Sequence, residues 1–331
     1  MDSPYSPLEF ALLNDWQRDF PLVPRPFAEI AAKAGADEPA VLAALTRLRQ
    51  RGAVSRIGAV FAPRRVGAST LAAIAAPAER VEEIAELISA HAEVNHNYQR
   101  EHELNLWFVA AADDEPALGA VLASIEQDTG CHVMSLPLER EYHIDLGFDL
   151  SSGHKRRASG ADAPARELDL NEKRLIAALA GGIHLVERPF RHLGEAAAMT
   201  EEEVIACIAG WLGEGMVKRF GVVVRHHELG YRANAMVVFD VADAEVDRVG
   251  ERLAAEPGVT LCYRRSRHVP RWPYNLYCMV HGRSRAEAMP VIERLARVAG
   301  AEPLALFSTR RFKQCGARYF AAPRVGADLD E

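Results

Sequence analysis

The hydrophobic and polar positions of VNHNYQREHELNLWF (94–108) predict two β-strands joined by a polar turn. The second strand, Leu104 to Val109, is apolar and aromatic, as is typical of a strand over a core. Side chains alternate between the two faces of a strand, so the first strand divides into two sets. One face carries Val94, His96, Tyr98 and Arg100, and the other carries Asn95, Asn97 and Gln99. Neither face is a continuous apolar stripe, which makes this strand a candidate for chemistry.

The rest of the chain predicts one order of elements, used twice. Three helices and a strand come first, at Leu8 to Asp19, Pro26 to Ala34, Glu38 to Gln50 and Ala53 to Phe61, and again at Asn171 to Ala180, Pro189 to Ala198, Glu201 to Gly213 and Val217 to Arg225. Strand, helix, strand, strand, helix and strand follow, at about 70–76, 79–91, 93–100, 104–111, 115–129 and 132–139, and again at about 233–241, 243–256, 259–265, 274–281, 284–299 and 303–309. Thr200 followed by three glutamates is a strong signal for the start of a helix.

Repeated sequence blocks show that the two halves arose by duplication. PLVPRPF (21–27) reappears as HLVERPF (184–190), and GAVSRIGAVFAPRRVG (52–67) reappears as GMVKRFGVVVRHHELG (215–230). VNHNYQR (94–100) matches VTLCYRR (259–265), and NLWFV (105–109) matches NLYCM (275–279). Tyrosine and arginine therefore recur in both halves and belong to the shared scaffold or to carboxylate binding, whereas Leu261 stands opposite His96.

The predicted domain organisation follows from the duplication. The first half spans 1–150, with a helix-turn-helix part at about 8–62 and a ferredoxin-like part at about 68–148. SSGHKRRASGADAPAR (151–166) has the composition of a linker. The second half spans 167–331, with the corresponding parts at about 169–226 and 231–320. The fold class is α+β: each half is a winged helix-turn-helix followed by a βαββαβ unit, and the halves pack as a pseudo-dimer.

Composition excludes several classes of protein. The chain has 331 residues, 49% of them hydrophobic, and a net charge of −7, which argues against a protein that coats nucleic acid. Neither a secretory signal nor an apolar run long enough for a membrane helix is present, so we expect no membrane partner. The five cysteines are scattered and form no CxxC pair, which favours a reducing cytoplasm over a disulfide framework or a zinc site.

The order of elements resembles the Lrp/AsnC transcription regulators, so DNA binding is the first hypothesis. The third helix would enter the major groove. In the first half it carries Arg47, Arg49 and Arg51, but in the second half TEEEVIACIAGWLGEG has no basic residue. Phosphate contacts need Lys or Arg. Two fused helix-turn-helix parts, one of which has an acidic third helix, are therefore a poor DNA-binding module.

Longer motifs resemble siroheme decarboxylases, a branch of the same fold. They are HNYQREHELNLWF, the FPLVPRPF block and RRSRHVPRWPYNLYCMVHG, which together with the repeats extend the resemblance over nearly the whole chain. The order of the halves resembles the fused two-subunit form of haem d1 biosynthesis. The resemblance implies non-oxidative removal of two acetate carboxylates from siroheme, a carbon–carbon lyase reaction that gives 12,18-didecarboxysiroheme. The alternative is a haem- or tetrapyrrole-sensing regulator that keeps the pocket and binds DNA.

Such a substrate carries eight carboxylates on a flat iron macrocycle, and arginine binds carboxylates best. The candidate substrate-binding residues are Arg56, Arg64, Arg65, Arg219, Arg225, His226, Tyr263, Arg264, Arg265, Arg267, Trp272 and Tyr274. Without a functional role, RRSRHVPR (264–271) would be the solvent-exposed tip of a hairpin. The aromatic residues Trp272 and Tyr274 that follow it favour contact with a flat polyanion.

The candidate catalytic residues are His96, Tyr98 and Arg100. His96 is the candidate proton donor, because imidazole titrates near neutral pH; the alternative role is a ligand to the substrate iron. Tyr98 would hydrogen-bond a carboxylate or pack against a helix, and Arg100 would hold the reacting acetate. In the second half, either one site serves both halves or another group, first of all His226, replaces the missing histidine.

The remaining expectations concern cofactors, partners and two asparagines. No Gly-rich phosphate loop, HExxH motif or Schiff-base lysine stands out, so we expect no cofactor, the iron being carried by the substrate. We expect siroheme and its decarboxylated product as binding partners, and we expect no binding to DNA. The sequence does not decide whether the chain forms a homo-oligomer. Asn105 and Asn275, each before an apolar strand, are predicted to tie their hairpins to the backbone.

Overall fold

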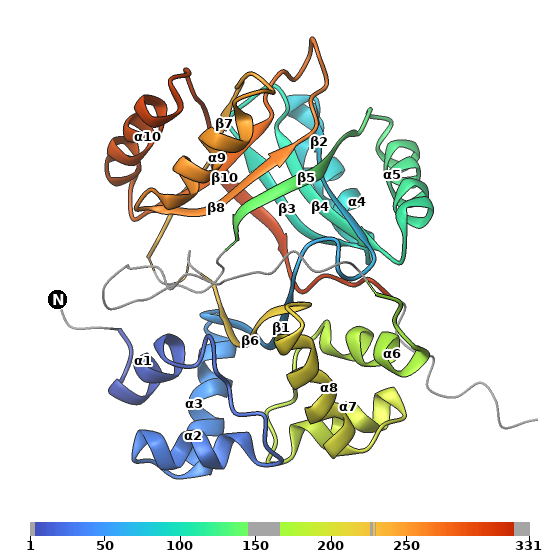
Figure 1. Ribbon diagram of the computed structural model, residues 1–331, viewed down its shortest axis with the longest axis vertical. Helices are drawn as coiled ribbons and strands as arrows, with labels where there is room; N and C mark the ends of the chain where they lie inside the picture. The colour runs from blue at the N-terminus through green and yellow to red at the C-terminus, as the bar shows by residue number, and fades with distance from the viewer. Residues whose placement is uncertain (1–3, 145–165, 226–227, 229, 321–331) are drawn as a thin grey trace, which may run out of the picture. The chain divides into compact units, whose positions relative to one another are not determined.

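The structure is a computed structural model that describes residues 4–144, 166–225, 228 and 230–320. It divides into two compact units (Figure 1). The helical unit comprises Met1–Gly67, Ala158–Arg225 and Arg318–Glu331, and the barrel unit comprises Ala68–Arg157 and His226–Ala317. Each unit therefore contains one part from the first half of the duplication and the equivalent part from the second half.

The helical unit contains two sets of three helices and a two-stranded ribbon. Its elements are α1 (Pro7–Asn14), α2 (Pro26–Ala34), α3 (Glu38–Gln50) and β1 (Val54–Phe61), followed by α6 (Leu170–Leu179), α7 (Pro189–Ala197), α8 (Glu201–Gly213) and β6 (Val217–Val224). Proline occupies the first turn of α2 and α7, and Thr200 caps α8 in a capping box. Strands β1 and β6 pair antiparallel, so the strand after each three-helix set pairs with its counterpart from the other half.

The first helix is shorter than predicted, because it ends at Asn14 rather than Asp19. The next residues bond to β6 instead of continuing the helix. The Trp16 carbonyl accepts from the Val222 N–H at 2.7 Å, and the Gln17 carbonyl accepts from the Arg219 guanidinium at 2.6 Å.

The barrel unit contains two βαββαβ parts, as predicted. The first consists of β2 (Ala68–Ile74), a 3₁₀ turn η1 (Ala78–Arg80), α4 (Val81–Ala90), β3 (Val94–Arg100), β4 (Leu106–Ala112), α5 (Glu115–Thr129) and β5 (Met134–Ile144). The second consists of β7 (Ala233–Phe239), α9 (Val246–Ala255), β8 (Val259–Arg265), β9 (Leu276–Gly282), α10 (Arg285–Ala299) and β10 (Leu304–Gln314). The strands close into a barrel in the order β10-β3-β4-β2-β5-β8-β9-β7.

The last strand of each part closes the barrel by changing partner along its length. Strand β5 pairs with β2 up to Pro137 and with β8 from Leu138 onward. Strand β10 pairs with β7 up to Phe307 and with β3 from Ser308 onward. Both strands extend five residues beyond their predicted ends, at 139 and 309, because a sheet edge of the other half continues the ladder.

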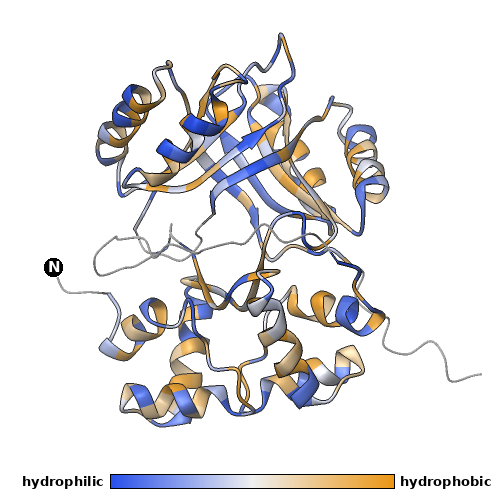
Figure 2. Ribbon diagram, in the orientation of Figure 1, coloured by the Kyte–Doolittle hydropathy of each residue, from blue (hydrophilic) through white to orange (hydrophobic). Residues whose placement is uncertain are grey.

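Among the described residues, three apolar clusters form the core of the barrel unit. Two lie between the strands and their helices, one in each half, and in Figure 2 these helices carry both hydrophobic and hydrophilic residues. The third cluster lines the inner face of the strands, the side that faces the barrel interior. It includes Trp107, Tyr263, Trp272 and Tyr277, so the centre of the barrel is filled by side chains. In the described part of the chain, no helix is both long and apolar enough to span a lipid bilayer.

Candidate functional site

Strand β3 presents the three candidate catalytic residues on the inner face of the barrel. The Asn97 amide donates to the Ala85 carbonyl at 3.0 Å and to the Ser89 hydroxyl at 3.1 Å, so Asn97 faces α4. Alternation then places His96 and Tyr98 on the inner face. Both are half-buried, whereas Arg100, further along the strand, is buried. The accessible part of this face is therefore the end that carries His96.

A β-bulge brings a second polar residue to His96. Val94 pairs with Ala110 and His96 with Val109, so Asn95 is an extra residue on β3. Its side-chain oxygen lies 2.6 Å from His96 Nδ1. The Tyr98 ring stacks beside the imidazole, with 6.2 Å between ring centroids and 18° between ring planes. Imidazole, amide and phenol thus form one polar cluster on the accessible part of the inner face.

Arg100 and Arg265 make equivalent cross-links between the halves of the barrel. Arg100 donates to the Leu306 carbonyl at 2.8 Å, and Arg265 donates to the Leu136 carbonyl at 2.5 Å. Burial lowers the pKa of Arg100 to about 10. Each guanidinium also lies over a tyrosine ring two residues earlier, at 5.8 Å from Tyr98 and 4.7 Å from Tyr263. These contacts are structural, and the predicted roles of both arginines in binding carboxylates stay predictions.

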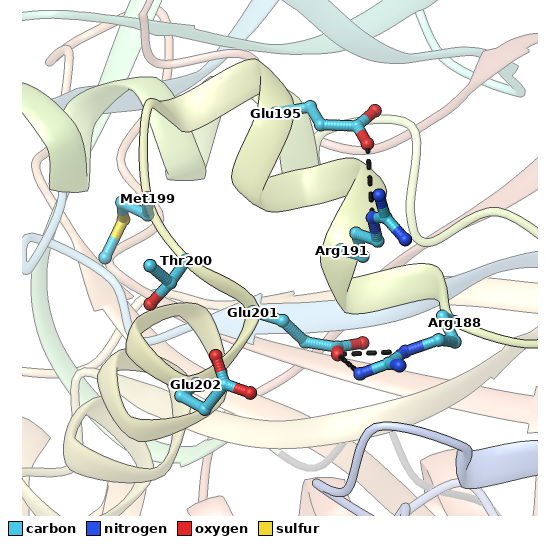
Figure 3. Close-up of a pocket in the computed structure, with 7 residues that line it drawn as sticks. All are labelled: Arg188, Arg191, Glu195, Met199, Thr200, Glu201 and Glu202. Atoms are coloured by element: carbon cyan, nitrogen blue, oxygen red, sulfur yellow. Dashed lines mark hydrogen bonds and ion pairs between the residues drawn. The ribbon is translucent and has the colours of Figure 1, made fainter.

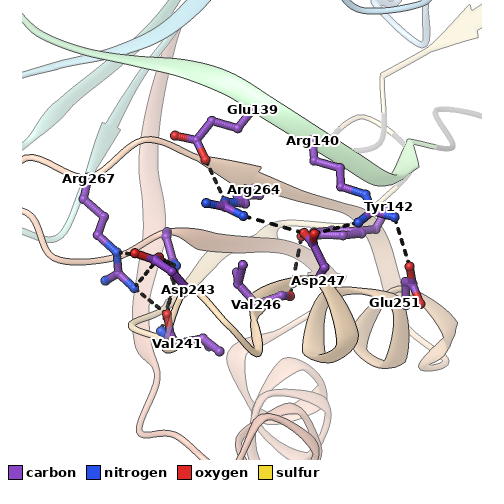
Figure 4. A network of polar contacts seen from close by, with 11 residues as sticks. Glu139, Arg140, Tyr142, Val241, Asp243, Val246, Asp247, Glu251, Arg264 and Arg267 are labelled. Atoms are coloured by element: carbon purple, nitrogen blue, oxygen red, sulfur yellow. Dashed lines mark hydrogen bonds and ion pairs between the residues drawn. The ribbon is translucent and has the colours of Figure 1, made fainter. Parts of the chain in front are cut away.

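The arginines of the second-half hairpin are engaged by acidic residues and carbonyls (Figure 4). Arg264 forms an ion pair with Glu139 at 2.6 Å. Arg267 forms an ion pair with Asp240 and a second one with Asp243 at 3.3 Å, and it donates to two backbone carbonyls. The hairpin is thus held to its own unit, and substrate binding by these two arginines stays a prediction.

The aromatic residues of the hairpin contribute to the inner core. Trp272 is fully buried and donates to the Tyr277 hydroxyl at 2.7 Å. Its ring lies 5.1 Å from Trp107 and 4.9 Å from Tyr274. Tyr263 stacks on Tyr277 at 5.7 Å. Among the predicted aromatic contacts to substrate, Tyr274 is the one that stays partly exposed.

The other predicted arginines belong to the helical unit. Arg219 is 3% exposed and bonds two carbonyls, those of Gln17 and Val222, so its contacts tie β6 to the segment after α1. Arg64 is exposed in a left-handed turn after β1, with φ of 59°. Arg56, Arg65 and Arg225 are half-buried. His226 lies outside the described residues.

Comparison with known proteins gives a consistent result along the chain. A profile described as "AsnC-like ligand binding domain" matches residues 65–143 and 228–313. A profile described as "Siroheme decarboxylase NirDL-like HTH domain" matches residues 9–54 and 172–217. The siroheme decarboxylase NirDL subunit of Paracoccus denitrificans is 49% identical over 94% of this chain and 96% of its own. The siroheme decarboxylase of Hydrogenobacter thermophilus is 31% identical, with 94% of each chain covered.

The chain belongs to the siroheme decarboxylase NirDL family. Solved structures agree with this assignment. The crystal structure of siroheme decarboxylase NirDL matches with a TM-score of 0.67 and 30% identity, covering 95% of this chain and 94% of that chain. A second crystal structure, of NirDL in complex with an iron-uroporphyrin III analogue, matches with the same TM-score and 29% identity, covering 95% of each chain. The predicted family and fold class are confirmed.

The sequence did not predict two contacts of bulged residues, that of Asn95 with His96 and that of Thr260 with His281. Asn95 was grouped with the face opposite His96, because a β-bulge leaves no clear mark in a single sequence. Its counterpart at the β8 bulge is Thr260, whose hydroxyl lies 3.0 Å from His281 Nδ1. By contrast, Asn105 and Asn275 tie their hairpins as predicted, through paired amide bonds to the backbone of Ala76 and Val241.

A surface cavity of about 420 Å³ lies in the helical unit (Figure 3). It is lined by Arg188, Arg191, Glu195, Met199, Thr200, Glu201 and Glu202. Arg188 pairs with Glu201, and Arg191 lies 3.7 Å from Glu195, so both guanidinium groups already face carboxylates. Its lining is acidic and includes no predicted site residue, so the cavity does not suit a polycarboxylate. Among the described residues, no group of three or more His, Cys, Asp or Glu could hold a metal ion.

Proposed function

We propose that this chain is a siroheme decarboxylase that removes two acetate carboxylates without oxidation and yields 12,18-didecarboxysiroheme. Membership of the NirDL family supports the substrate class, as does a relative of similar fold in complex with an iron-uroporphyrin III analogue. The reaction class is that of a carbon–carbon lyase. We propose no organic cofactor, with the iron arriving inside the substrate.

The observation that carries the proposal is the half-buried His96 on the inner face of β3, beside Asn95 and Tyr98. In each decarboxylation the bond between the acetate CH₂ carbon and its carboxylate breaks, and CO₂ leaves. The electron pair stays on the CH₂ carbon, which takes one proton and becomes a methyl group. His96 supplies that proton, and Tyr98 hydrogen-bonds a substrate carboxylate. Because side chains fill the centre of the barrel, the macrocycle binds at the accessible end of the inner face, next to His96.

The remaining predicted residues keep supporting roles in this proposal. Arg100 holds β3 against β10 and places positive charge behind the Tyr98 ring. The role of Arg64 in binding a substrate carboxylate stays a prediction. We also propose a cytoplasmic location, since all five cysteines are free.

Anaerobic incubation with siroheme, followed by mass analysis of the tetrapyrrole, tests the proposal. We expect a product lighter by two CO₂ units. Unchanged siroheme, together with a sequence-specific shift of a DNA probe, would instead identify a tetrapyrrole-sensing regulator.

A further inference from the structure

The contact between Asn95 and His96 depends on the local backbone. In a regular strand, neighbouring side chains point to opposite faces, so an Asn–His pair in sequence would not meet. The bulge at Asn95 removes this restriction. The Asn95 carbonyl also accepts from the Cys315 N–H at 2.8 Å, which fixes the bulged residue against the end of β10. Asn95 is 4% exposed, so water does not compete strongly for its amide oxygen.

The chemistry of the contact defines the protonation of the ring. An amide oxygen accepts hydrogen bonds and cannot donate them, so the nitrogen facing it, Nδ1, carries hydrogen. In the neutral ring the unprotonated nitrogen is then Nε2. In the imidazolium both nitrogens carry hydrogen, and the contact to Asn95 persists. The proton exchanged with substrate therefore belongs to Nε2, and it leaves without disturbing the bond at Nδ1.

The second half uses the same bulge position in a similar way. The Thr260 hydroxyl donates to the Met279 carbonyl at 3.2 Å and lies 3.0 Å from His281 Nδ1, from which it then accepts. Here the histidine comes from β9 and not from the residue after the bulge. Each half thus holds the Nδ1 atom of one histidine with the side chain of its bulged residue, and this gives a matched pair for experiment.

We propose that Asn95 is a positioning residue for the decarboxylation: it holds His96 with hydrogen on Nδ1, so that Nε2 delivers the proton to the substrate carbon. The inference rests on the proposed function for its catalytic consequence, but the ring geometry it describes is independent of turnover. A metal-bound imidazole that loses the partner of its second nitrogen typically loses roughly 10- to 100-fold in function, and we expect a loss of the same size for His96.

The test compares Asn95→Ala, which removes the acceptor, with Asn95→Asp, which keeps one, and with Thr260→Val as the matched control in the second half. We expect Asn95→Ala to lower kcat for siroheme about 10- to 100-fold with KM within about twofold. We expect Asn95→Asp to keep kcat near the wild-type value and to move the pH–rate profile to higher pH, because a carboxylate stabilises the imidazolium. We expect Thr260→Val to retain wild-type kcat.

The charged and titratable groups near His96 stay the same in these variants. Among the described residues they include Tyr98 on the same strand and Arg311 on β10, which pairs with Glu228 at 2.9 Å. Lys313 on β10 lies on the other face, where it donates to the Ser89 and His91 carbonyls. On β4 the residues paired with this part of β3 are apolar. A shift of the pH profile in Asn95→Asp is therefore attributable to the new carboxylate.

Nitrogen-15 NMR of histidine-labelled protein reads the tautomer directly. The chain has 12 histidines, and the signal lost in His96→Ala assigns His96. We expect hydrogen on Nδ1 in wild type and Asn95→Asp, and a mixture of tautomers in Asn95→Ala. Wild-type kcat in Asn95→Ala, an Asn95→Asp as impaired as Asn95→Ala, or an equal loss in Thr260→Val would each overturn the inference. If His96→Ala itself turns over normally, the proposed mechanism fails while the NMR result still decides the role of Asn95.

Discussion

His96 and Leu261 occupy equivalent positions, each directly after a bulge and each on the inner face of the barrel. The duplication therefore provides its own comparison, with an imidazole in one half and an alkyl side chain in the other. The alignment of VNHNYQR with VTLCYRR predicted this difference from the sequence. It also predicted that the shared tyrosines and arginines belong to a common scaffold or to carboxylate binding. The contacts of Arg100 and Arg265 favour the scaffold, which a sequence could not reveal because each arginine bonds a strand from the other half.

Replacing His96 by glutamine removes the proton donor while keeping a polar side chain of similar size. We predict a fall in kcat of about 10²- to 10⁴-fold, the usual contribution of a positioned general acid. Siroheme binding, followed by its visible absorption, should persist. Leu261→Ala is the matched control and should keep its turnover, and near-normal turnover of His96→Gln would remove His96 as the acid.

A second residue-scale prediction concerns Glu172 in the helical unit. The Arg166 guanidinium bonds both of its oxygens, at 2.9 and 2.5 Å, and holds the pKa of Glu172 at about 2, well below its usual 4.5. A carboxyl group whose pKa is lowered by folding stabilises the native state above its unfolded pKa. This stabilisation is lost as pH falls from about 4.5 to about 2. Melting curves across this range should show a smaller loss of Tm in Arg166→Gln than in wild type, and parallel curves would contradict the prediction.

At the scale of elements, the last strand of each βαββαβ part is the feature that joins the halves. Beyond its own sheet, β5 lies on α9 of the other half, with Tyr142 bonded to Asp247 at 2.5 Å (Figure 4). Strand β10 makes the equivalent contact with α4, where Arg310 pairs with Glu82. The sequence predicted both strands but ended them five residues early, because their second partners are more than 100 residues away along the chain.

Gly250 on α9 allows Tyr142 to dock. A Cβ atom at this position would lie 2.3 Å from the Tyr142 ring, which is held by Asp247. We predict that Gly250→Ala lowers the free energy of unfolding by about 1–3 kcal/mol, as overpacking does. Gly119→Ala is the control: it also lies inside a helix, α5, but has no atom within 4 Å of its Cβ position. It should raise the free energy of unfolding by about 0.5–1 kcal/mol. Denaturant titrations measure both, and equal effects would refute the docking role of Gly250.

At the scale of the whole molecule, the duplication predicted a pseudo-dimer in which like parts associate. In the structure, the strands β1 and β6 pair, and the ferredoxin-like parts close one barrel. The repeated blocks of sequence carry this information, since equivalent segments bury equivalent faces. They carry none about which residues lie next to His96. That proximity depends on the bulge and on the end of β10, and both are set by pairing between distant strands.

The most direct test of the central claim is the number of CO₂ molecules released for each siroheme consumed under anaerobic conditions, with the mass of the tetrapyrrole measured in the same samples. We predict two CO₂ per siroheme for the wild-type chain and for Leu261→Ala, and almost none for His96→Gln over the same time. Siroheme recovered unchanged from the wild-type chain, with no CO₂ released, would contradict the assignment.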